Sequence, residues 1–302
     1  MQPFIRWFGG KTSKIREFAR FFPVNIRDRV YFEPFVGCGA MFLHFKPKEA
    51  VISDLNERLI NCYLAVRDGL PALVAELDRL RDAEKKAWNS APGKDERLRE
   101  LYDAVKNEFN AGPVDGERSA AMMIYLNVRC YNGLYRVNSD GEFNTPFGGD
   151  DKKRRAIYDA RNLANVSAYL KTNRVEILAG DYRQVARGGA PARRSFYFLD
   201  PPYMPLTKTA SFTQYGMSPW KNEDFDEFRS FIDGLDSAGA KFLACNSDTP
   251  EARSLFSGYR IFSHAIQRSA SCKGDERGPV KEIVVTNYPV ATIDDFVRPA
   301  VS

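Results

Sequence analysis

The stretch Ser195-Phe196-Tyr197-Phe198-Leu199-Asp200-Pro201-Pro202-Tyr203 decides the fold. Its first five residues form a continuous apolar and aromatic run that is too short for a helix, as is typical of a parallel strand buried on both faces. In open α/β sheets, ligands bind just beyond the carboxyl ends of such strands, which is where Asp200 to Tyr203 stand. The sequence therefore predicts an α/β fold with a ligand site directly after this strand.

The tetrapeptide Asp200–Tyr203 combines hydrogen-bond acceptors with a flat ring. Pro201 and Pro202 lack a backbone N–H and fix φ, so the local backbone presents carbonyl oxygens beside the Asp200 carboxylate. Because Tyr203 adds an aromatic face, the group suits the exocyclic amino group of a planar base. The plainer alternative is a strand that ends in a proline turn, with Asp200 as its cap.

The composition limits the class of protein. A length of 302 residues favours two domains, or one domain with an insertion, and the net charge of +5 is compatible with a polyanionic partner. Five cysteines without a CxxC pair and only two histidines disfavour a zinc site, a disulfide framework and a Ser/His relay, so we expect free thiols and no metal. The absence of a secretory or membrane-spanning apolar run predicts a cytoplasmic protein.

Short apolar strands occupy the two ends of the sequence, and helices occupy its middle. The predicted strands are Val30–Phe32, Ala50–Ile52, Val175–Leu178, Ser195–Leu199, Lys241–Cys245 and Ile283–Thr286. Acids or amides follow several of them, namely Glu33, Asp54, Asp181, Asp200 and Asn246. Such a row of polar groups outlines one ligand crevice in a doubly wound, Rossmann-like sheet.

Between about residues 56 and 165 the apolar residues recur at helical spacing. One such face contains Leu98, Leu101, Tyr102, Val105 and Phe109, and a loop near Ala91-Pro92-Gly93-Lys94 interrupts the helices. We therefore predict a catalytic domain formed by residues 1–56 and 166–302, with residues 57–165 inserted as a second domain.

The segment Phe35-Val36-Gly37-Cys38-Gly39 predicts a cofactor turn. Two glycines around one residue permit a tight strand-to-helix turn that a ligand can approach. A dinucleotide fingerprint would need a third glycine where Phe42 stands, which disfavours a nicotinamide oxidoreductase. Asp54 ends the next strand, where an acid can hold ribose hydroxyls. Together with Asp200, these residues predict a nucleoside cofactor that lies along the strand ends beside a planar substrate.

The dipeptide Asp140-Gly141 predicts a hairpin between Leu134–Asn138 and Glu142–Asn144. A two-stranded ribbon fits the DNA major groove, where Arg136 can read the O6/N7 edge of guanine. The alternative is a plain surface hairpin with a solvated arginine. The run Lys152-Lys153-Arg154-Arg155 is either a solvated helix start or a grip on phosphates.

These motifs, in this order, resemble the Dam-like, α-type family of site-specific DNA N6-adenine methyltransferases. The resemblance lies in Phe4–Lys11, Glu33–Gly39, Asp54–Asn56, Tyr131–Leu134, Gly141–Asn144 and Asp200–Tyr203. In the α-type order, the recognition domain stands between the cofactor motif and the catalytic motif. Each motif alone is shared by unrelated proteins, whereas the ordered set covers most of the chain and is specific.

The resemblance implies transfer of a methyl group from S-adenosylmethionine to N6 of an adenine flipped out of double-stranded DNA, by a bacterial or phage enzyme that acts as a monomer. The implied cofactor contacts are Trp7, Lys11, Glu33, Phe35, Gly37, Gly39, Asp54 and Asp181. The implied adenine pocket consists of Asp200, Pro201, Pro202 and Tyr203. The implied DNA contacts are Arg6, Tyr131, Asn132, Leu134, Arg136, Pro146, Lys152 and Lys153.

The recognition sequence is expected to be GATC or a related site. Two positions depart from the family pattern: Arg6 stands where the family has a lysine, and Gly149-Asp150 stands where it has a basic residue and an aromatic. The alternatives are a catalytically inactive DNA-binding homologue and a methyltransferase for RNA adenine or a glutamine amide. The sequence leaves open whether a restriction partner exists.

Overall fold

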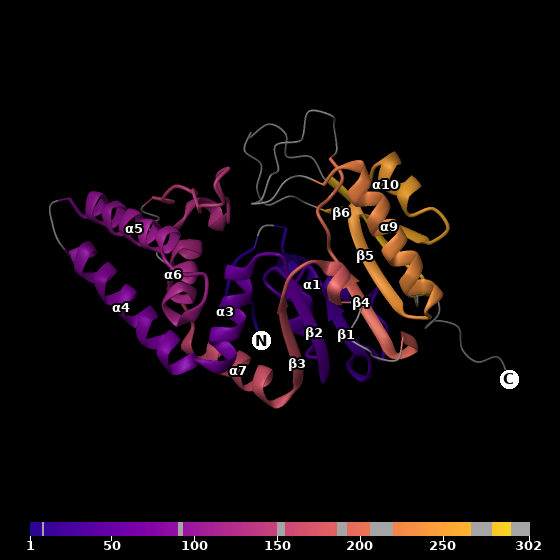
Figure 1. The fold of residues 1–302 in the computed structure, drawn as a ribbon, viewed down its shortest axis with the longest axis horizontal. Coiled ribbons are helices and arrows are strands. Elements are labelled where there is room, and N and C mark those ends of the chain that lie inside the picture. Colours follow the sequence, from indigo (N-terminus) through magenta and orange to yellow (C-terminus); the bar gives the residue numbers. More distant parts are fainter. Residues whose placement is uncertain are drawn as a thin grey trace.

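A seven-stranded sheet forms the centre of the protein. The computed structural model describes residues 1–7, 9–89, 93–149, 155–185, 192–205, 220–266 and 280–290. The strands are β1 (Val30–Glu33), β2 (Glu49–Asp54), β3 (Arg174–Ala179), β4 (Ser195–Leu199), β5 (Lys241–Ser247), β6 (Arg260–Ile266) and β7 (Val280–Thr286). Their order is β3-β2-β1-β4-β5-β7-β6, with the first five parallel and β7 antiparallel to both neighbours (Figure 1). This confirms the predicted Rossmann-like α/β class.

The strand order reverses between β1 and β4. From β1 the chain proceeds through β2 to β3 on one side, and it then returns to β4 on the other side of β1. Such a switch point opens a crevice beyond the carboxyl ends of the two central strands. Glu33 ends β1 and Asp200 directly follows β4, so both residues stand at this crevice.

Strand β6 is absent from the sequence-based prediction. It lies at the edge of the sheet and pairs only with β7. None of the side chains of Arg260, Ile261, Phe262 and Ser263 is fully buried. A half-solvated edge strand lacks the continuous apolar run by which the central strands were found.

Helices cover both faces of the sheet. They are α1 (Ile15–Ala19), α2 (Ala40–Phe45), α3 (Glu57–Asp68), α4 (Leu70–Asn89), α5 (Lys94–Ala111), α6 (Gly116–Arg129), α7 (Ala160–Thr172), α8 (Tyr182–Val185), α9 (Asn222–Ser237) and α10 (Pro250–Leu255). Adjacent residues of β1 belong to different cores: Tyr31 packs with α2 and α3, whereas Phe32 packs with α8 and α9. This alternation follows from the period of two along a strand. Among the described helices, none has the length and apolarity needed to cross a bilayer.

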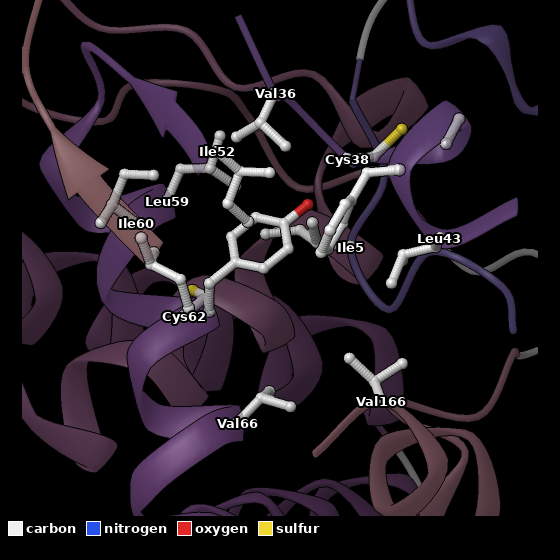
Figure 2. Close-up of a cluster of buried hydrophobic side chains, with 14 of the residues drawn as sticks. Ile5, Val36, Cys38, Leu43, Ile52, Leu59, Ile60, Cys62, Val66 and Val166 are labelled. Carbon is white, nitrogen blue, oxygen red and sulfur yellow. The ribbon is translucent and has the colours of Figure 1, made fainter. Parts of the chain in front are cut away.

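The larger core joins the turn after β1 to the helices that follow β2. Figure 2 shows Val36 and Cys38 of this turn beside Ile52 of β2 and Leu59 and Ile60 of α3. The packing fixes the turn, and with it the crevice, to a helix that leads toward the inserted segment.

Helices α4, α5 and α6 pack on one another and form a unit beside the sheet (Figure 1). The predicted break at Ala91–Lys94 falls between α4 and α5, although residues 90–92 lie outside the described part of the chain. Helix α3 contacts β2 and β3, and α7 contacts β3. The division into residues 1–56 plus 166–302 and an insert of residues 57–165 stays a prediction.

The predicted hairpin forms a turn with little strand pairing. The amide hydrogen of Asn138 donates to the carbonyl oxygen of Glu142 (2.9 Å), and Val137 and Phe143 form an isolated antiparallel bridge. The amide hydrogen of Asn144 also donates to the carbonyl oxygen of Arg136 (2.9 Å). On the outer side of the hairpin, the Asn110 side chain of α5 bonds both the amide hydrogen and the carbonyl oxygen of Phe143 (2.9 and 3.0 Å). The hairpin is thus fastened to the helical unit through its outer side, by the Asn110 side chain.

Candidate active site and nucleic-acid interface

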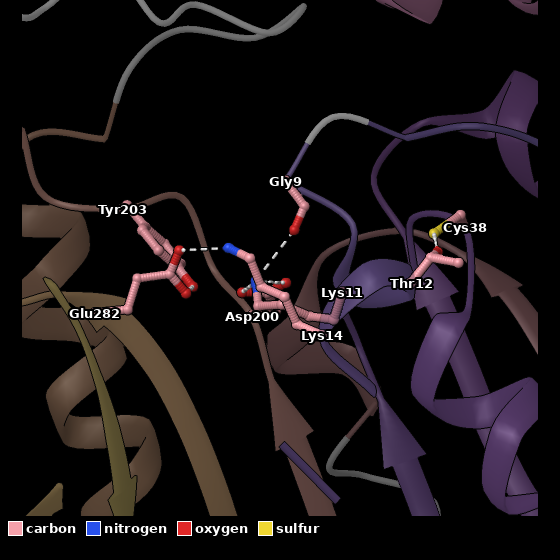
Figure 3. A network of polar contacts seen from close by, with 8 residues as sticks. All are labelled: Gly9, Lys11, Thr12, Lys14, Cys38, Asp200, Tyr203 and Glu282. Atoms are coloured by element: carbon pink, nitrogen blue, oxygen red, sulfur yellow. Dashed lines mark hydrogen bonds and ion pairs between the residues drawn. The ribbon is translucent and has the colours of Figure 1, made fainter. Parts of the chain in front are cut away.

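The Asp200 carboxylate is paired with a buried lysine. Lys11, in a 3-10 turn (Lys11–Lys14), places Nζ 2.7 Å from each carboxylate oxygen of Asp200 and 3.2 Å from the Gly9 carbonyl oxygen (Figure 3). Burial raises the pKa of Asp200 and the ammonium opposes that shift. Burial alone would lower the pKa of Lys11, but the charge of Asp200 raises it. At 2.7 Å the attraction keeps both groups ionised, so Asp200 offers a carboxylate rather than an acid.

Tyr203 is oriented by a second acid. Its hydroxyl donates to Oε2 of Glu282 on β7 (3.1 Å), and Lys14 donates to Oε1 of the same carboxylate (3.4 Å; Figure 3). The Lys11 ammonium lies 5.1 Å from the centre of the Tyr203 ring, within reach of a cation–π attraction. Glu282 and Lys14 are site residues that the sequence-based prediction missed. The available signal was weak: a lone acid at the start of an apolar strand.

The end of β5 holds the backbone that follows the tetrapeptide. The side-chain oxygen of Asn246 accepts from the amide hydrogens of Met204 and Ser247 (2.9 Å each), and the Ser247 hydroxyl donates to the Met204 carbonyl oxygen (2.8 Å). Pro201 is buried and Pro202 is exposed. Asn246, which the sequence placed just after a strand and which lies near the end of β5, therefore holds the backbone directly after the tetrapeptide.

The two glycines after β1 are required by the turn itself. Gly37 and Gly39 have φ of 48° and 64°, which favours glycine. A Cβ on Gly37 would lie 2.7 Å from the Trp7 ring, and a Cβ on Gly39 would lie 2.6 Å from the Tyr63 hydroxyl. The amide hydrogen of Gly37 donates to Asp54 Oδ2 (3.0 Å). Asp54 thus ties the turn to the end of β2, and its half-buried side chain remains partly accessible.

Glu33 lies at the base of this turn and is only 2% exposed. Its Oε2 accepts from the Tyr31 hydroxyl (2.6 Å) and from the Phe42 amide hydrogen (3.2 Å). Burial raises the pKa of Glu33 from 4.5 to about 8, against the effect of these hydrogen bonds. The carboxyl is therefore protonated at neutral pH in the unliganded fold.

The pH dependence of stability tests this assignment. Because the folded-state pKa is raised, the stabilising contribution of Glu33 is complete below pH 4.5 and is lost as pH rises through about 8. Within that window the slope is about 1.4 kcal/mol per pH unit. We expect Glu33→Gln to gain stability relative to the unmodified protein as pH rises from about 4.5 to about 8. Urea unfolding at several pH values measures this, and parallel curves for the two proteins would contradict it.

Aromatic rings surround the ends of β1 and β3. Phe35 contacts Tyr182 (ring centres 5.3 Å apart) and Trp220 (6.0 Å). Asp181 precedes Tyr182, and its carboxylate accepts from the Arg183 guanidinium at 2.7 and 2.8 Å. This partner lowers the pKa of Asp181. Three of the predicted cofactor contacts therefore lie at neighbouring strand ends, namely Phe35, Asp54 and Asp181. A fourth, Lys11, lies instead beside Asp200.

A side chain of α6 holds the N-terminal segment by hydrogen bonds. The Asn127 side chain accepts from the amide hydrogen of Arg6 and donates to the Arg6 carbonyl oxygen (2.9 Å each), and it also donates to the Gly133 carbonyl oxygen (3.3 Å). Trp7 stacks on Tyr135, with ring centres 5.5 Å apart. Asn127 and Tyr135 were not predicted from sequence. They connect the N-terminus with residues 131–146, which we call the recognition segment.

Five of the predicted DNA-contacting residues lie on one segment after α6, namely Tyr131, Asn132, Leu134, Arg136 and Pro146. Tyr131 is 51% exposed, and Asn132 beside it has a φ of 55°. Leu134 is half-buried and Pro146 is exposed. The amide hydrogen of Tyr131 donates to the Pro146 carbonyl oxygen (2.9 Å), so the two ends of the segment meet.

Arg136 is exposed but held in place. Its Nε donates to Asn144 Oδ1 (2.8 Å) and its Nη2 donates to the Asn144 carbonyl oxygen (3.2 Å). These bonds use two of the five N–H donors of a guanidinium. Arg6 is also exposed, and burial together with the charge of Arg155 lowers its pKa. Lys152, Lys153 and Asp150 lie outside the described residues.

The described part of the chain contains no group of three or more His, Cys, Asp or Glu residues able to hold an ion. The site consists of two strand ends with carboxylates, a flat ring beside one of them, and a nearby segment that carries the exposed Arg136. Such a site suits a nucleoside and a planar amino compound.

Comparison with known proteins agrees with this chemistry. The sequence model of the D12 class N6 adenine-specific DNA methyltransferases matches residues 7–270. The chain is 36% identical over 299 residues to the type II methyltransferase M.MjaIII of Methanocaldococcus jannaschii. This match covers 95% of this chain and 99% of that protein. It is 33% identical over 283 residues to the DNA N-6-adenine-methyltransferase of Escherichia phage P1, and this match covers 93% of this chain and 34% of that protein. It is 29% identical over 290 residues to the DNA adenine methylase of Escherichia coli K12 (95% of each).

Proposed function

This chain belongs to the D12 class of N6 adenine-specific DNA methyltransferases, and on that premise we propose that it moves a methyl group from S-adenosylmethionine to an adenine flipped out of duplex DNA. The observation that carries the proposal is the Lys11–Asp200 pair at the switch point of the sheet, followed by the Tyr203 ring. An inactive homologue would not need this pair. An RNA adenine remains the alternative substrate.

The cofactor pocket is proposed at the ends of β1, β2 and β3. S-adenosylmethionine, when bound, supplies a methyl group on a sulfonium centre. Asp54 and Asp181 offer carboxylate oxygens for its hydroxyl and amino groups, and Phe35 offers a ring for its base. Phe35 and Asp54 are half-buried, which leaves them accessible to a ligand. The other proposed contacts are Trp7, Lys11, Glu33, Gly37 and Gly39.

The adenine pocket is proposed at Asp200–Tyr203. The adenine amino nitrogen is a poor nucleophile, because its lone pair is delocalised into the ring. Asp200 and the Pro201 carbonyl oxygen would accept the two amino hydrogens, localise the lone pair and aim it at the donor. A carboxylate has about four lone-pair positions, so Asp200 can accept from Lys11 and from adenine together. After transfer, the acidic proton leaves to Asp200 or to water.

Tyr203 is proposed to stack on the flipped base. Glu282 fixes the direction of its hydroxyl, so the ring is oriented before the base arrives. Extrusion of a paired base costs a few kcal/mol, which protein contacts must offset. The Tyr131 side chain is half exposed, and its backbone is held by the hydrogen bond to the Pro146 carbonyl oxygen. An exposed ring on a held backbone suits a wedge in the opened duplex. Asn132 is proposed to assist it.

Arg136 is proposed to read a guanine in the major groove, with Leu134 and Pro146 near the bases. We expect Arg136→Ala to cost about 1–3 kcal/mol on the cognate site and to relax base preference at one position, because a bidentate contact is lost. The measurement is the rate of methylation on a set of duplexes that differ at single positions.

Arg136→Lys is the matched control, since it keeps the charge but loses the planar fork. A variant that methylates cognate DNA more slowly but keeps the same base preference would place Arg136 on phosphates instead. Arg6 is proposed as a second reader. The site is proposed to be GATC or related, and methylation of plasmid DNA followed by sequencing of modified adenines determines it.

A further inference from the structure

Cations gather at the amino ends of the parallel strands, that is, at the end of the sheet opposite the candidate active site. Strands β1 to β5 are parallel, so all of them begin at this edge, where α7 leads into β3 in the lower part of Figure 1. Nine cationic residues stand at or just before these strand starts, and we call them the strand-start strip: Arg27, Arg29, Lys46, Lys48, Lys171, Arg174, Arg193, Arg194 and Lys241. Seven of the nine are exposed, and Arg29 and Lys241 are half-buried.

Hydrogen bonds and an ion pair join the strip into one surface. The Arg174 amide hydrogen donates to the Lys48 carbonyl oxygen (3.1 Å), which connects β3 with β2. The Lys48 ammonium lies 3.8 Å from the Asp28 carboxylate, and Arg194 donates to the Asp28 carbonyl oxygen (3.4 Å). The strip crosses five strands, or about 19 Å at about 4.8 Å per strand spacing.

The charge of the strip is not balanced locally. Among the described residues, the carboxylates at the same strand ends are Asp28, Glu49, Glu176 and Asp236, together with Asp68, which pairs with Arg67. Nine cations and the four carboxylates outside the Arg67 pair leave a formal charge of +5. This equals the net charge of the entire 302-residue chain, so the rest of the molecule is neutral in sum.

Titratable groups at the edge also respond to this charge. Burial and the charge of Arg29 lower the pKa of Lys241. Burial, the N-terminal amino group and Lys46 lower the pKa of His44. A positive field of this kind attracts a polyanion.

The strip cannot serve the duplex whose adenine is methylated. β4 has five residues, so about 17 Å separates its start from Asp200 at about 3.3 Å per residue, with the sheet between them. We propose that the strand-start strip binds the phosphates of a second duplex DNA segment. A strip of about 19 Å spans about six base-pair steps of about 3.4 Å.

Duplex DNA fits this surface better than unpaired nucleic acid does. Binding of unpaired bases relies on exposed aromatic rings. The exposed large apolar side chains among the described residues are Val24, Leu55, Val114 and Tyr131, and the one ring in this set lies on the recognition segment. The strip therefore offers charge without a stacking platform. Two DNA segments on one chain would allow transfer between them during the search for sites.

A triple variant, Lys48→Gln, Arg193→Gln and Arg194→Gln, tests the proposal in the full chain. Each protein is saturated with a short duplex that carries its mapped site, in the presence of S-adenosylhomocysteine, and is then titrated with a labelled duplex that lacks the site. We expect the unmodified protein to bind this second duplex. We expect the variant to bind it at least about tenfold more weakly at 50 mM salt, with a salt slope smaller by about three.

The matched control is Lys85→Gln, Arg97→Gln and Arg99→Gln, which removes the same charge from α4 and α5. The proposal is supported if this control binds the second duplex as the unmodified protein does. It is overturned if the unmodified protein takes up one duplex only, if both triple variants lose the same affinity, or if the strip variant loses binding to phosphatidylserine vesicles but not to DNA.

The proposal relies on the DNA substrate of the family and not on the roles assigned to Asp200 or Arg136. Methylation of a short duplex separates the two questions, because the strip variant should methylate it at the rate of the unmodified protein. Failure of all proteins to methylate DNA would contradict the proposed function. No site would then be mapped, and direct titration of the three proteins with one labelled duplex would still report on the strip, because the strip variant alone should lose affinity and salt dependence.

Discussion

Asp200→Ala is expected to lower kcat for methyl transfer at least about 10³-fold while binding of S-adenosylmethionine is largely kept. The loss follows from the removal of the charged acceptor that would hold the adenine amino group. Cofactor binding should persist, because the proposed cofactor pocket centres on the Gly37 turn and Asp54. Single-turnover kinetics and cofactor titration measure the two quantities separately.

The control for this substitution concerns Lys11, which is 4% exposed and would be left as a buried charge without its partner. Asp200→Asn keeps the volume and one acceptor oxygen, and Asp200→Asn with Lys11→Met also removes the stranded charge. All three variants should be inactive, and the double variant should recover stability. Full activity in Asp200→Ala would refute the assigned role.

Arg129→Met is expected to destabilise the protein by about 3–5 kcal/mol. Arg129 ends α6 and forms a bidentate ion pair with Glu84 of α4, with N–O distances of 2.5 and 2.7 Å. The side chains of Arg129 and Glu84 are 8% and 9% exposed. Removal of one partner leaves the other charge buried. Urea unfolding measures the change, and a loss below about 1 kcal/mol would contradict it.

The double variant Arg129→Met with Glu84→Leu is the control and should recover most of the lost stability, because no buried charge remains. The pair also bears on DNA recognition. The Arg129 carbonyl oxygen accepts from the Gly148 amide hydrogen (2.9 Å), which closes the recognition segment near Tyr131. The single variant should therefore also bind DNA more weakly than its stability alone would predict.

The central strands and the crevice could be predicted because their signals are local. The run Ser195–Leu199 is buried on both faces, so its composition alone indicated a strand, and Asp200 follows it directly. The edge strand β6 faces solvent and gave no such signal.

The partners within the site could not be predicted, because they come from distant parts of the chain. Lys11 meets Asp200 across 189 residues, and Tyr203 meets Glu282 across 79. Residue type and spacing say nothing about such pairs until the topology is known. The same reason applies to the hairpin, where Phe143 bonds Asn110 of α5 across 33 residues.

The most direct test of the central claim is to incubate the protein with S-adenosylmethionine labelled in its methyl group and with duplex DNA, and then to digest the DNA to nucleosides. The account predicts that the label is recovered as N6-methyldeoxyadenosine, and that single-stranded RNA of the same sequence stays unlabelled. Label on cytosine or on RNA, or no label on DNA, would contradict it.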